Sequence, residues 1–411
     1  MSLRAFSVLA VSALALTACS DKPAEPKGDA APTATLTIWA DDQRAAALKP
    51  FATQFGTANK VDVQVQAVSK DLQTNFVTAA QSGKGPDIVV GAHDWIGNLV
   101  QNGTIDPIQL SDTQKSGFAD VAVKAVTFNG QVYGVPYAIE NLALIRNTDL
   151  APNAPATIED LVAAGKALKD SGKVSNIMSL QVGQNGDAYH VYPLFASAGG
   201  YLFGTKANGD YDPADLGVGK PESIEAFKKI AALGEKGSGA LTRSVNSDNA
   251  IPTFTGGKTP FLISGPWAVA DIKKAGIKYD ITPVPAFAGG KPAQPFVGVQ
   301  AFYVASKGKS KALANEFITN YLTKPDLQVA LYQANPRPPA LTAALDQVKG
   351  SDPDIEKWLA AGKGGAVLPA IPAMAAVWDP FGKAESAIVG GADVPATLTG
   401  AAKTISDAIA K

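Results

Sequence analysis

Strand and helix patterns alternate at the beginning of the folded body, and this order constrains the fold more than any other feature. Apolar side chains alternate at residues 36–40 and 61–65, and a short apolar run at residues 85–91 predicts a third strand. Two helical patterns separate these strands, one at residues 41–56 and one that begins at a Ser69 cap. The order strand, helix, strand, helix, strand is typical of a mostly parallel sheet, so we expect an α/β fold.

The third of these strands leads directly into Asp94 and Trp95. In open α/β sheets, ligands collect beyond the carboxyl ends of the strands, so a carboxylate and an aromatic ring at this place are candidates for binding. The alternative is that Asp94 caps a following helix and Trp95 packs against the core.

The rest of the chain contains a second alternation of strands and helices. Asn129 and Gly130 predict a hairpin turn, and Thr157 begins a helix with Asp160 at the distance of a capping box. Further strand patterns occur at residues 260–263 and 296–305, and helical patterns dominate from there to the C-terminus. We therefore expect two α/β units and a largely helical C-terminal part.

Composition excludes several classes of function. The chain has 411 residues, of which 46% are hydrophobic and 18% charged, which is typical of a globular protein with two or three domains. The net charge of −1 and the absence of basic runs argue against a nucleic-acid partner. The sequence contains only two histidines, His93 and His190, far apart, so a zinc site or a catalytic histidine lacks its usual companions. We expect no metal, no cofactor and no catalytic residue.

The N-terminus has the features of an export signal. Arg4 precedes an apolar run at residues 5–16 that is too short to span a bilayer. The sequence Leu16-Thr17-Ala18-Cys19 resembles the bacterial lipobox, and Cys19 is the single cysteine of the chain. We expect a signal peptide at residues 1–18, lipidation of Cys19 and a flexible tether at residues 19–35. The body would then be anchored to the cell membrane on its extracytoplasmic side.

Short motifs occur in a fixed order along the whole body. They are Trp39-Ala40-Asp41, Gly85-Pro86-Asp87-Ile88, Ala92-His93-Asp94, Pro136-Tyr137-Ala138-Ile139-Glu140, Gly265-Pro266-Trp267, Phe296-Val297-Gly298-Val299 and Ile371-Pro372-Ala373-Met374. With these motifs in this order, the chain from about Leu36 to Lys411 resembles the maltose/maltodextrin-binding proteins of ABC sugar importers. No single motif is specific; their collinear spacing carries the resemblance.

The resemblance implies a two-lobed, periplasmic-binding-protein-like α/β fold with a ligand cleft between the lobes. Lobe 1 would comprise residues 36–139 and 301–346, and lobe 2 would comprise residues 142–295 and 351–411. Hinges would lie near residues 140–141, 296–300 and 347–350. The implied partners are an oligosaccharide and the membrane-embedded permease subunits of an ABC transporter, with the protein itself a monomer.

Sugar recognition needs polar groups for the hydroxyls and flat aromatic rings for the C–H faces of the pyranose. The resemblance implies hydroxyl contacts from Asp41, Arg44, Asp94 and Glu140, and ring stacking from an aromatic set at Tyr189, Trp267 and Trp378. With the neighbouring candidates added, the expected ligand-binding residues are Asp41, Arg44, Asp94, Trp95, Glu140, Asp187, Tyr189, Trp267, Trp378 and Asp379.

The chain also departs from the family pattern. Gly91 stands where the best-known members carry a Trp, and Trp95 stands where they carry an Arg. Asp379 and Gly382 likewise replace a Tyr and an Arg, so the particular sugar stays open. Arg337 is a further departure in a proline-rich loop, where it either reaches the cleft or lies in solvent.

The leading expectation is a binding protein that captures a maltose/maltodextrin-type oligosaccharide and delivers it to a permease. One alternative is a protein of the same fold that binds another sugar or a polyol, including a phosphorylated one. The other is an exported glycoside hydrolase or lyase that uses two of Asp41, Asp94, Asp187 and Glu140 as acid and base.

Overall fold

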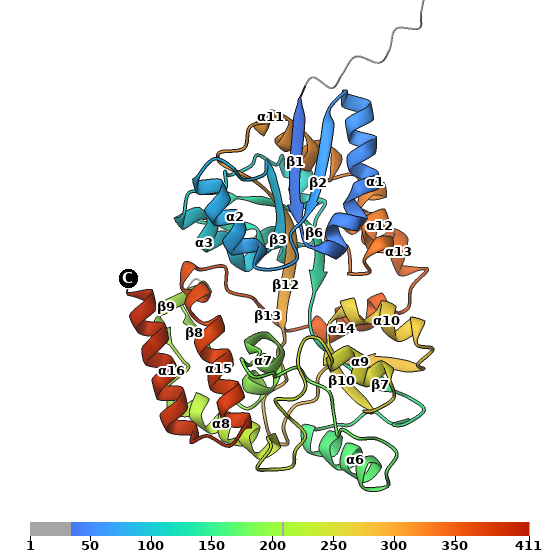
Figure 1. Cartoon of the computed structure of the whole chain (residues 1–411), viewed down its shortest axis with the longest axis vertical. Helices are drawn as coiled ribbons and strands as arrows, with labels where there is room; N and C mark the ends of the chain where they lie inside the picture. Colours follow the sequence, from blue (N-terminus) through green and yellow to red (C-terminus); the bar gives the residue numbers. More distant parts are fainter. Residues whose placement is uncertain (1–33, 208, 411) are drawn as a thin grey trace, which may run out of the picture.

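The computed structural model describes residues 34–207 and 209–410 (Figure 1). The signal peptide, Cys19 and nearly all of the expected tether lie outside these described residues. Within them, no helix is long and apolar enough to cross a membrane.

The largest sheet is mixed and has the strand order β13-β12-β3-β1-β2, with β6 also pairing with β12. Its strands are β1 (Thr35–Ala40), β2 (Asp62–Ala67), β3 (Ile88–Ala92), β6 (Gly134–Glu140), β12 (Phe296–Val304) and β13 (Ala366–Val367). Strand β1 pairs in parallel with β2 and β3, which confirms the parallel arrangement expected from the first alternation. Strand β12 runs antiparallel to both β3 and β6, and this makes the sheet mixed.

Helices connect the first strands as the sequence predicts. Helix α1 (Asp42–Asn59) begins after Asp41, whose carboxylate accepts a hydrogen bond from the backbone N–H of Arg44. Helix α2 (Leu72–Gln81) begins after Asp71, so the expected Ser69 cap is wrong. The backbone of Asp71 is left-handed, with φ of 51°, and its side chain makes no cap hydrogen bond. A turn in the backbone therefore sets the start of α2, and side-chain capping does not.

Smaller sheets complete the strand content. Strands β7 (Ala143–Asn147), β10 (Phe261–Ser264) and β11 (Tyr279–Thr282) form an antiparallel sheet with β7 in the middle. Two further pairs are β4 (Thr127–Phe128) with β5 (Gln131–Val132), and β8 (Phe203–Thr205) with β9 (Tyr211–Leu216). Asn129 and Gly130 connect β4 to β5 with φ of 49° and 77°, which confirms the predicted hairpin turn.

The other helices surround these sheets. They are α3 (Ile96–Gln101), α4 (Asp112–Ser116), α5 (Asp120–Ala125), α6 (Ile158–Asp170), α7 (Ala188–Ser197), α8 (Pro221–Leu233), α9 (Ala250–Thr255), α10 (Val269–Lys274), α11 (Lys311–Glu316), α12 (Pro325–Ala334), α13 (Thr342–Lys349), α14 (Asp354–Gly362), α15 (Trp378–Val389) and α16 (Val394–Ile409). Short 3₁₀ turns are η1 (His93–Trp95), η2 (Pro266–Ala268) and η4 (Pro372–Ala376), and η3 (Phe317–Tyr321) is a π-helical turn. The capping box at Thr157 and Asp160 forms as predicted at the start of α6.

Two large hydrophobic clusters form the core. The first surrounds the mixed sheet and draws its buried side chains from residues 36–139 and 297–344. The second draws them from residues 142–296 and 368–405, around α7, α8, α15 and α16. The chain passes between the clusters after β6 and along β12, so the two clusters interleave in the sequence. In Figure 1 the first cluster occupies the upper half of the view and the second cluster the lower half.

Candidate functional site

Glu140 is at the centre of a polar group that forms where β6 and β12 pass between the two clusters. It is the last residue of β6, and its carboxylate accepts hydrogen bonds from Gln300 Nε2 and Arg337 Nε, each at 2.6 Å. Burial alone would raise the pKa of Glu140, but the positive charges of Arg337 and Arg44 hold that pKa below its ordinary value. Glu140 is therefore a buried carboxylate that keeps its charge.

Arg337 comes from the loop between α12 and α13 and is 6% exposed. The loop runs beside β6, with Ile139 N–H donating to the Pro338 carbonyl at 2.8 Å and Ala340 N–H donating to the Tyr137 carbonyl at 3.0 Å. Of the two alternatives left open by the sequence, the solvent-exposed one is wrong. Arg337 and Gln300 were absent from the expected site residues; the prolines beside Arg337 indicate a fixed loop, but not where that loop packs.

Asp41 and Arg44 are brought together at the start of α1. Arg44 Nη1 lies 2.9 Å from Asp41 Oδ2, and their side chains are 13% and 38% exposed, respectively. Arg44 also faces Tyr137 and Glu140, which contribute to its electrostatic surroundings. The two expected residues therefore lie near the Glu140 group and pair with each other.

Asp94 and Trp95 belong to η1, directly after β3, as the sequence predicts. Both side chains are partly buried, and burial raises the pKa of Asp94 to about 7, although a hydrogen bond from Trp378 acts in the opposite direction. The Trp95 ring lies against Gly91, because a Cβ atom at residue 91 would be only 2.0 Å from Trp95 Cζ3. Trp95 thus fills the space that a side chain at residue 91 would occupy.

Three aromatic side chains of the expected set lie near these polar groups. The Tyr189 and Trp267 ring centroids are 6.4 Å apart, and the Trp378 side chain lies near enough to the Asp94 carboxylate to lower its pKa. Trp267 packs against Gly265, and the Arg337 guanidinium lies over its ring at 5.8 Å from the centroid. Trp267, which borders the second cluster, thereby contacts a residue from a loop that packs on the first.

The two remaining expected residues are occupied elsewhere. Asp187 caps α7, accepting hydrogen bonds from the backbone N–H groups of Tyr189 at 3.1 Å and His190 at 2.9 Å. Its carboxylate also lies 3.0 Å from His190 Nδ1, so Asp187 contacts the backbone that carries Tyr189. Asp379 is 69% exposed and pairs with Lys383 at 2.8 Å, and the structure does not bring it into the Glu140 group.

His93 connects elements that are far apart in the sequence. Val299 N–H donates to His93 Nδ1 at 3.0 Å, so the ring carries its proton on Nε2, which lies 2.9 Å from the Leu368 carbonyl. Burial lowers the pKa of His93 to about 4, and the ring is therefore neutral at physiological pH. The described residues contain no group of His, Cys, Asp and Glu side chains suited to a metal ion.

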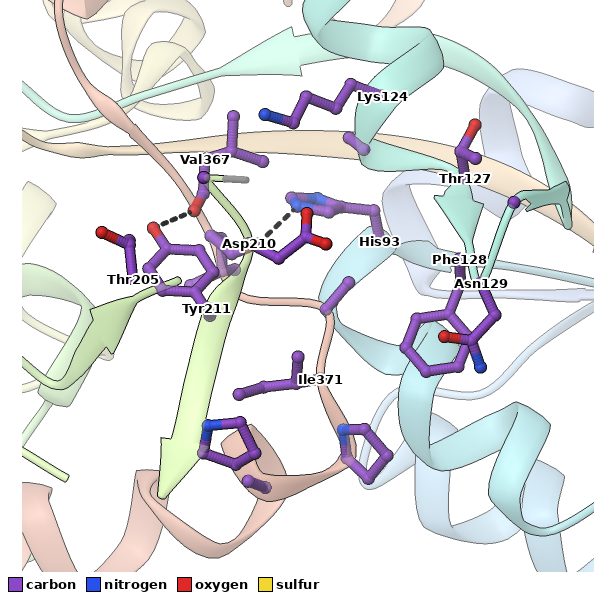
Figure 2. A pocket seen from close by; sticks show the side chains of 18 of the residues that line it. His93, Lys124, Thr127, Phe128, Asn129, Thr205, Asp210, Tyr211, Val367 and Ile371 are labelled. Carbon is purple, nitrogen blue, oxygen red and sulfur yellow. Dashed lines mark hydrogen bonds between the residues drawn. The ribbon is translucent and has the colours of Figure 1, made fainter. Parts of the chain in front are cut away.

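A cavity of about 1280 Å³ is lined in part by Val367 of β13, and none of the expected ligand-binding residues lines it. Its walls come from the β4–β5 hairpin, from β9 and from the segment around Ile371, and His93 also lines it (Figure 2). Tyr211 donates a hydrogen bond to the Val367 carbonyl at 2.7 Å across one side of it.

A family model described as a bacterial extracellular solute-binding protein matches residues 47–361. The chain belongs to this family. Its members are binding proteins and not enzymes, which confirms the expectation of no catalysis and excludes the glycoside hydrolase alternative. Membership also places this solute-binding protein outside the cytoplasm.

Curated relatives match nearly the whole solute-binding protein. It is 27% identical to a galactooligosaccharide-binding protein of Bacillus subtilis, over 97% of this chain and 95% of the relative. It is 30% identical to the maltodextrin-binding protein MdxE of Bacillus subtilis, over 91% of this chain and 90% of the relative. A maltooligosaccharide ABC transporter solute-binding lipoprotein of Streptococcus pneumoniae is 28% identical, over 90% of this chain and 88% of the relative.

Proposed function

We propose that this solute-binding protein captures a malto- or galacto-oligosaccharide and delivers it to the permease of an ABC importer. The observation that carries the proposal is the polar group around Glu140, which lies beside the ring of Trp267 between the two hydrophobic clusters. Charged donors and acceptors next to aromatic rings are the combination that sugar hydroxyls and pyranose faces require. Relatives named for malto- and galacto-oligosaccharide binding support this ligand class.

In this proposal Glu140, Asp94 and Arg44 bind hydroxyl groups, and Tyr189, Trp267 and Trp378 cover ring faces. Asp41 orients Arg44 through their ion pair, and Asp187 orients Tyr189 by capping α7. Trp95 contributes an aromatic surface at the end of β3. Asp379 would reach the ligand only by leaving Lys383, so it is the weakest member of the proposed set.

We also propose that the two clusters are lobes that close over the ligand. Lobe 1 would comprise residues 36–139 and 301–346, and lobe 2 residues 142–295 and 351–411, with hinges near 140–141, 296–300 and 347–350. Support comes from the interleaving of the clusters in the sequence, which changes from one to the other close to these hinges. The ligand would stabilise the closed conformation, and the permease would distinguish this conformation from the open, empty one.

Lipidation of Cys19 would hold the body near the permease, through the tether at residues 19–35. The Streptococcus pneumoniae relative is named as a lipoprotein, which supports this anchor. Mass spectrometry of the membrane-extracted protein should show a diacylglyceryl group on Cys19. An unmodified thiol on that residue would contradict the anchor.

Isothermal titration calorimetry of the purified protein tests the ligand class. We expect saturable binding of maltotriose or a β-galactotriose, and no binding of sn-glycerol 3-phosphate, which represents the polyol alternative. The preferred trisaccharide would decide between the malto and the galacto series. A protein that binds neither trisaccharide at millimolar concentration would contradict the proposal.

A further inference from the structure

We propose that Arg337 is a specificity-determining residue. Its Nη2 donates a hydrogen bond to one hydroxyl of the ligand, and the neighbouring hydroxyl donates a hydrogen bond to Glu140. This inference rests on the proposed function and adds to it a contact that the resemblance does not supply. The preferred ligand would be a sugar with two adjacent hydroxyls on the ring that reaches Glu140.

The first step of the argument is that the backbone fixes the place of Arg337. Its loop is hydrogen-bonded to β6 on both sides of Pro339, through the Pro338 carbonyl and the Ala340 N–H. Prolines at 336 and 338 restrict the backbone immediately before and after Arg337. The side chain therefore starts from a position beside the end of β6, where Glu140 lies.

The second step is that the guanidinium is held by three neighbours. Its Nε donates to Glu140 Oε2 at 2.6 Å, its Nη1 donates to the Asn335 side chain, and its plane lies over Trp267. Within the described residues, Nη2 makes no hydrogen bond, and this nitrogen is not completely buried. A nitrogen that is held in place but unpaired, and that lies next to the proposed stacking ring, is suited to a ligand.

The third step concerns the chemistry of the Arg337–Glu140 pair. A guanidinium only donates hydrogen bonds, and an ionised carboxylate only accepts them. Each oxygen of Glu140 already accepts one bond, from Gln300 or Arg337, and keeps capacity for another. Side by side, the two groups match two neighbouring hydroxyls, of which one donates to Glu140 and the other accepts from Arg337.

A competing role for Arg337 is to neutralise Glu140 and nothing more. The two roles differ in what they require, because Lys supplies the positive charge but has no planar second nitrogen. The variant Arg337→Lys should therefore keep the fold and lose the ligand contact. We expect its affinity for the preferred trisaccharide to fall roughly tenfold or more, as for a lost charge-assisted hydrogen bond.

Arg243→Lys is the matched control. Arg243 also pairs with a carboxylate through its guanidinium, at 2.7 Å from Glu235 Oε2, but it lies after α8 and outside the proposed site. This variant should bind the trisaccharide like the parent, and calorimetry with thermal unfolding measures both properties. Should Arg337→Lys fail to fold, the double variant Glu140→Gln with Arg337→Gln removes both charges together and should bind the trisaccharide more weakly than the single variant Glu140→Gln, whereas equal affinities of the two would overturn the inference.

Deoxy analogues identify the contact itself. The parent should lose affinity for the analogue that lacks the hydroxyl facing Nη2, whereas Arg337→Lys should bind that analogue and the trisaccharide equally. A Lys variant that binds within twofold of the parent and still discriminates between the two sugars would overturn the inference and leave the proposed function intact. A parent protein that binds no oligosaccharide would overturn both.

Discussion

A single missing side chain determines where the Trp95 ring lies. The ring occupies the space above Gly91, and a Cβ atom there would meet three of its carbons within 2.6 Å. The sequence shows the two departures from the family pattern separately, at Gly91 and at Trp95. The structure connects them, because the Trp95 ring fills the space that a side chain at residue 91 would occupy.

Gly91→Ala should therefore displace the Trp95 ring. We expect a loss of stability of about 1–3 kcal/mol from overpacking, together with weaker oligosaccharide binding. Gly400→Ala is the control, because residue 400 lies in α16 with nothing within 4 Å of the added carbon. That control should bind normally. Chemical unfolding and calorimetry check both variants, and an unchanged affinity of Gly91→Ala would remove Trp95 from the proposed site.

Trp267→Ala and Trp378→Ala should each weaken sugar binding by about 1–3 kcal/mol, because each removes a ring face or a partner of Asp94. Phe317→Leu is the comparison. Phe317 is fully buried in the first cluster, and its ring neighbours Phe55, Phe302 and Tyr321 are not proposed site residues, so its replacement should lower the free energy of unfolding and leave affinity unchanged. Titrations monitored by calorimetry distinguish the two results. Normal binding by both alanine variants would place the ligand elsewhere.

Among the elements, β12 has the most connections. It pairs with β3, β6 and β13, and its N–H at Val299 holds the His93 ring. The strand itself could be predicted, because its apolar run is local in the sequence. Its antiparallel pairing with β3 could not, because the partner lies about two hundred residues away and no turn signal connects them.

The same distinction explains what could be predicted of the site. Asp94 follows a strand and Glu140 ends one, and strand ends can be recognised from local patterns. Arg337 is buried against Glu140, 197 positions away, and against Trp267, and no local sequence pattern predicts either contact. The start of α2 at Asp71 was missed because a left-handed backbone, and not a side-chain cap, sets it.

The attachment of His93 to β12 predicts a pH effect on stability. The folded protein holds His93 neutral with a pKa of about 4, whereas the unfolded chain binds a proton below about pH 6.5. The unfolded state therefore binds more protons in this window, and stability falls as the pH drops from about 6.5 towards 4. We expect the protonation of His93 in the unfolded state to lower the free energy of unfolding by roughly 3 kcal/mol over this pH range.

His93→Gln should lack this contribution, because glutamine does not titrate. Urea unfolding from pH 7 to pH 4 measures the difference between parent and variant at each pH. The two curves should converge as the pH falls. Parallel curves over the whole range would show that His93 does not titrate on unfolding.

At the scale of the whole molecule, the proposed closure predicts a change in shape. Small-angle X-ray scattering should show a smaller radius of gyration when the preferred trisaccharide is added, since the two clusters would approach one another. Trp267→Ala at the same sugar concentration should keep the larger value. An identical radius for the parent with and without sugar would contradict hinge closure.

The interleaving of the two clusters has a consequence for the gene. A stop codon between β11 and β12 would leave the mixed sheet without its central antiparallel strand and the second cluster without α15 and α16. Neither half of such a reading frame encodes a complete core. Two separately expressed fragments should therefore regain structure only by reassembling with each other.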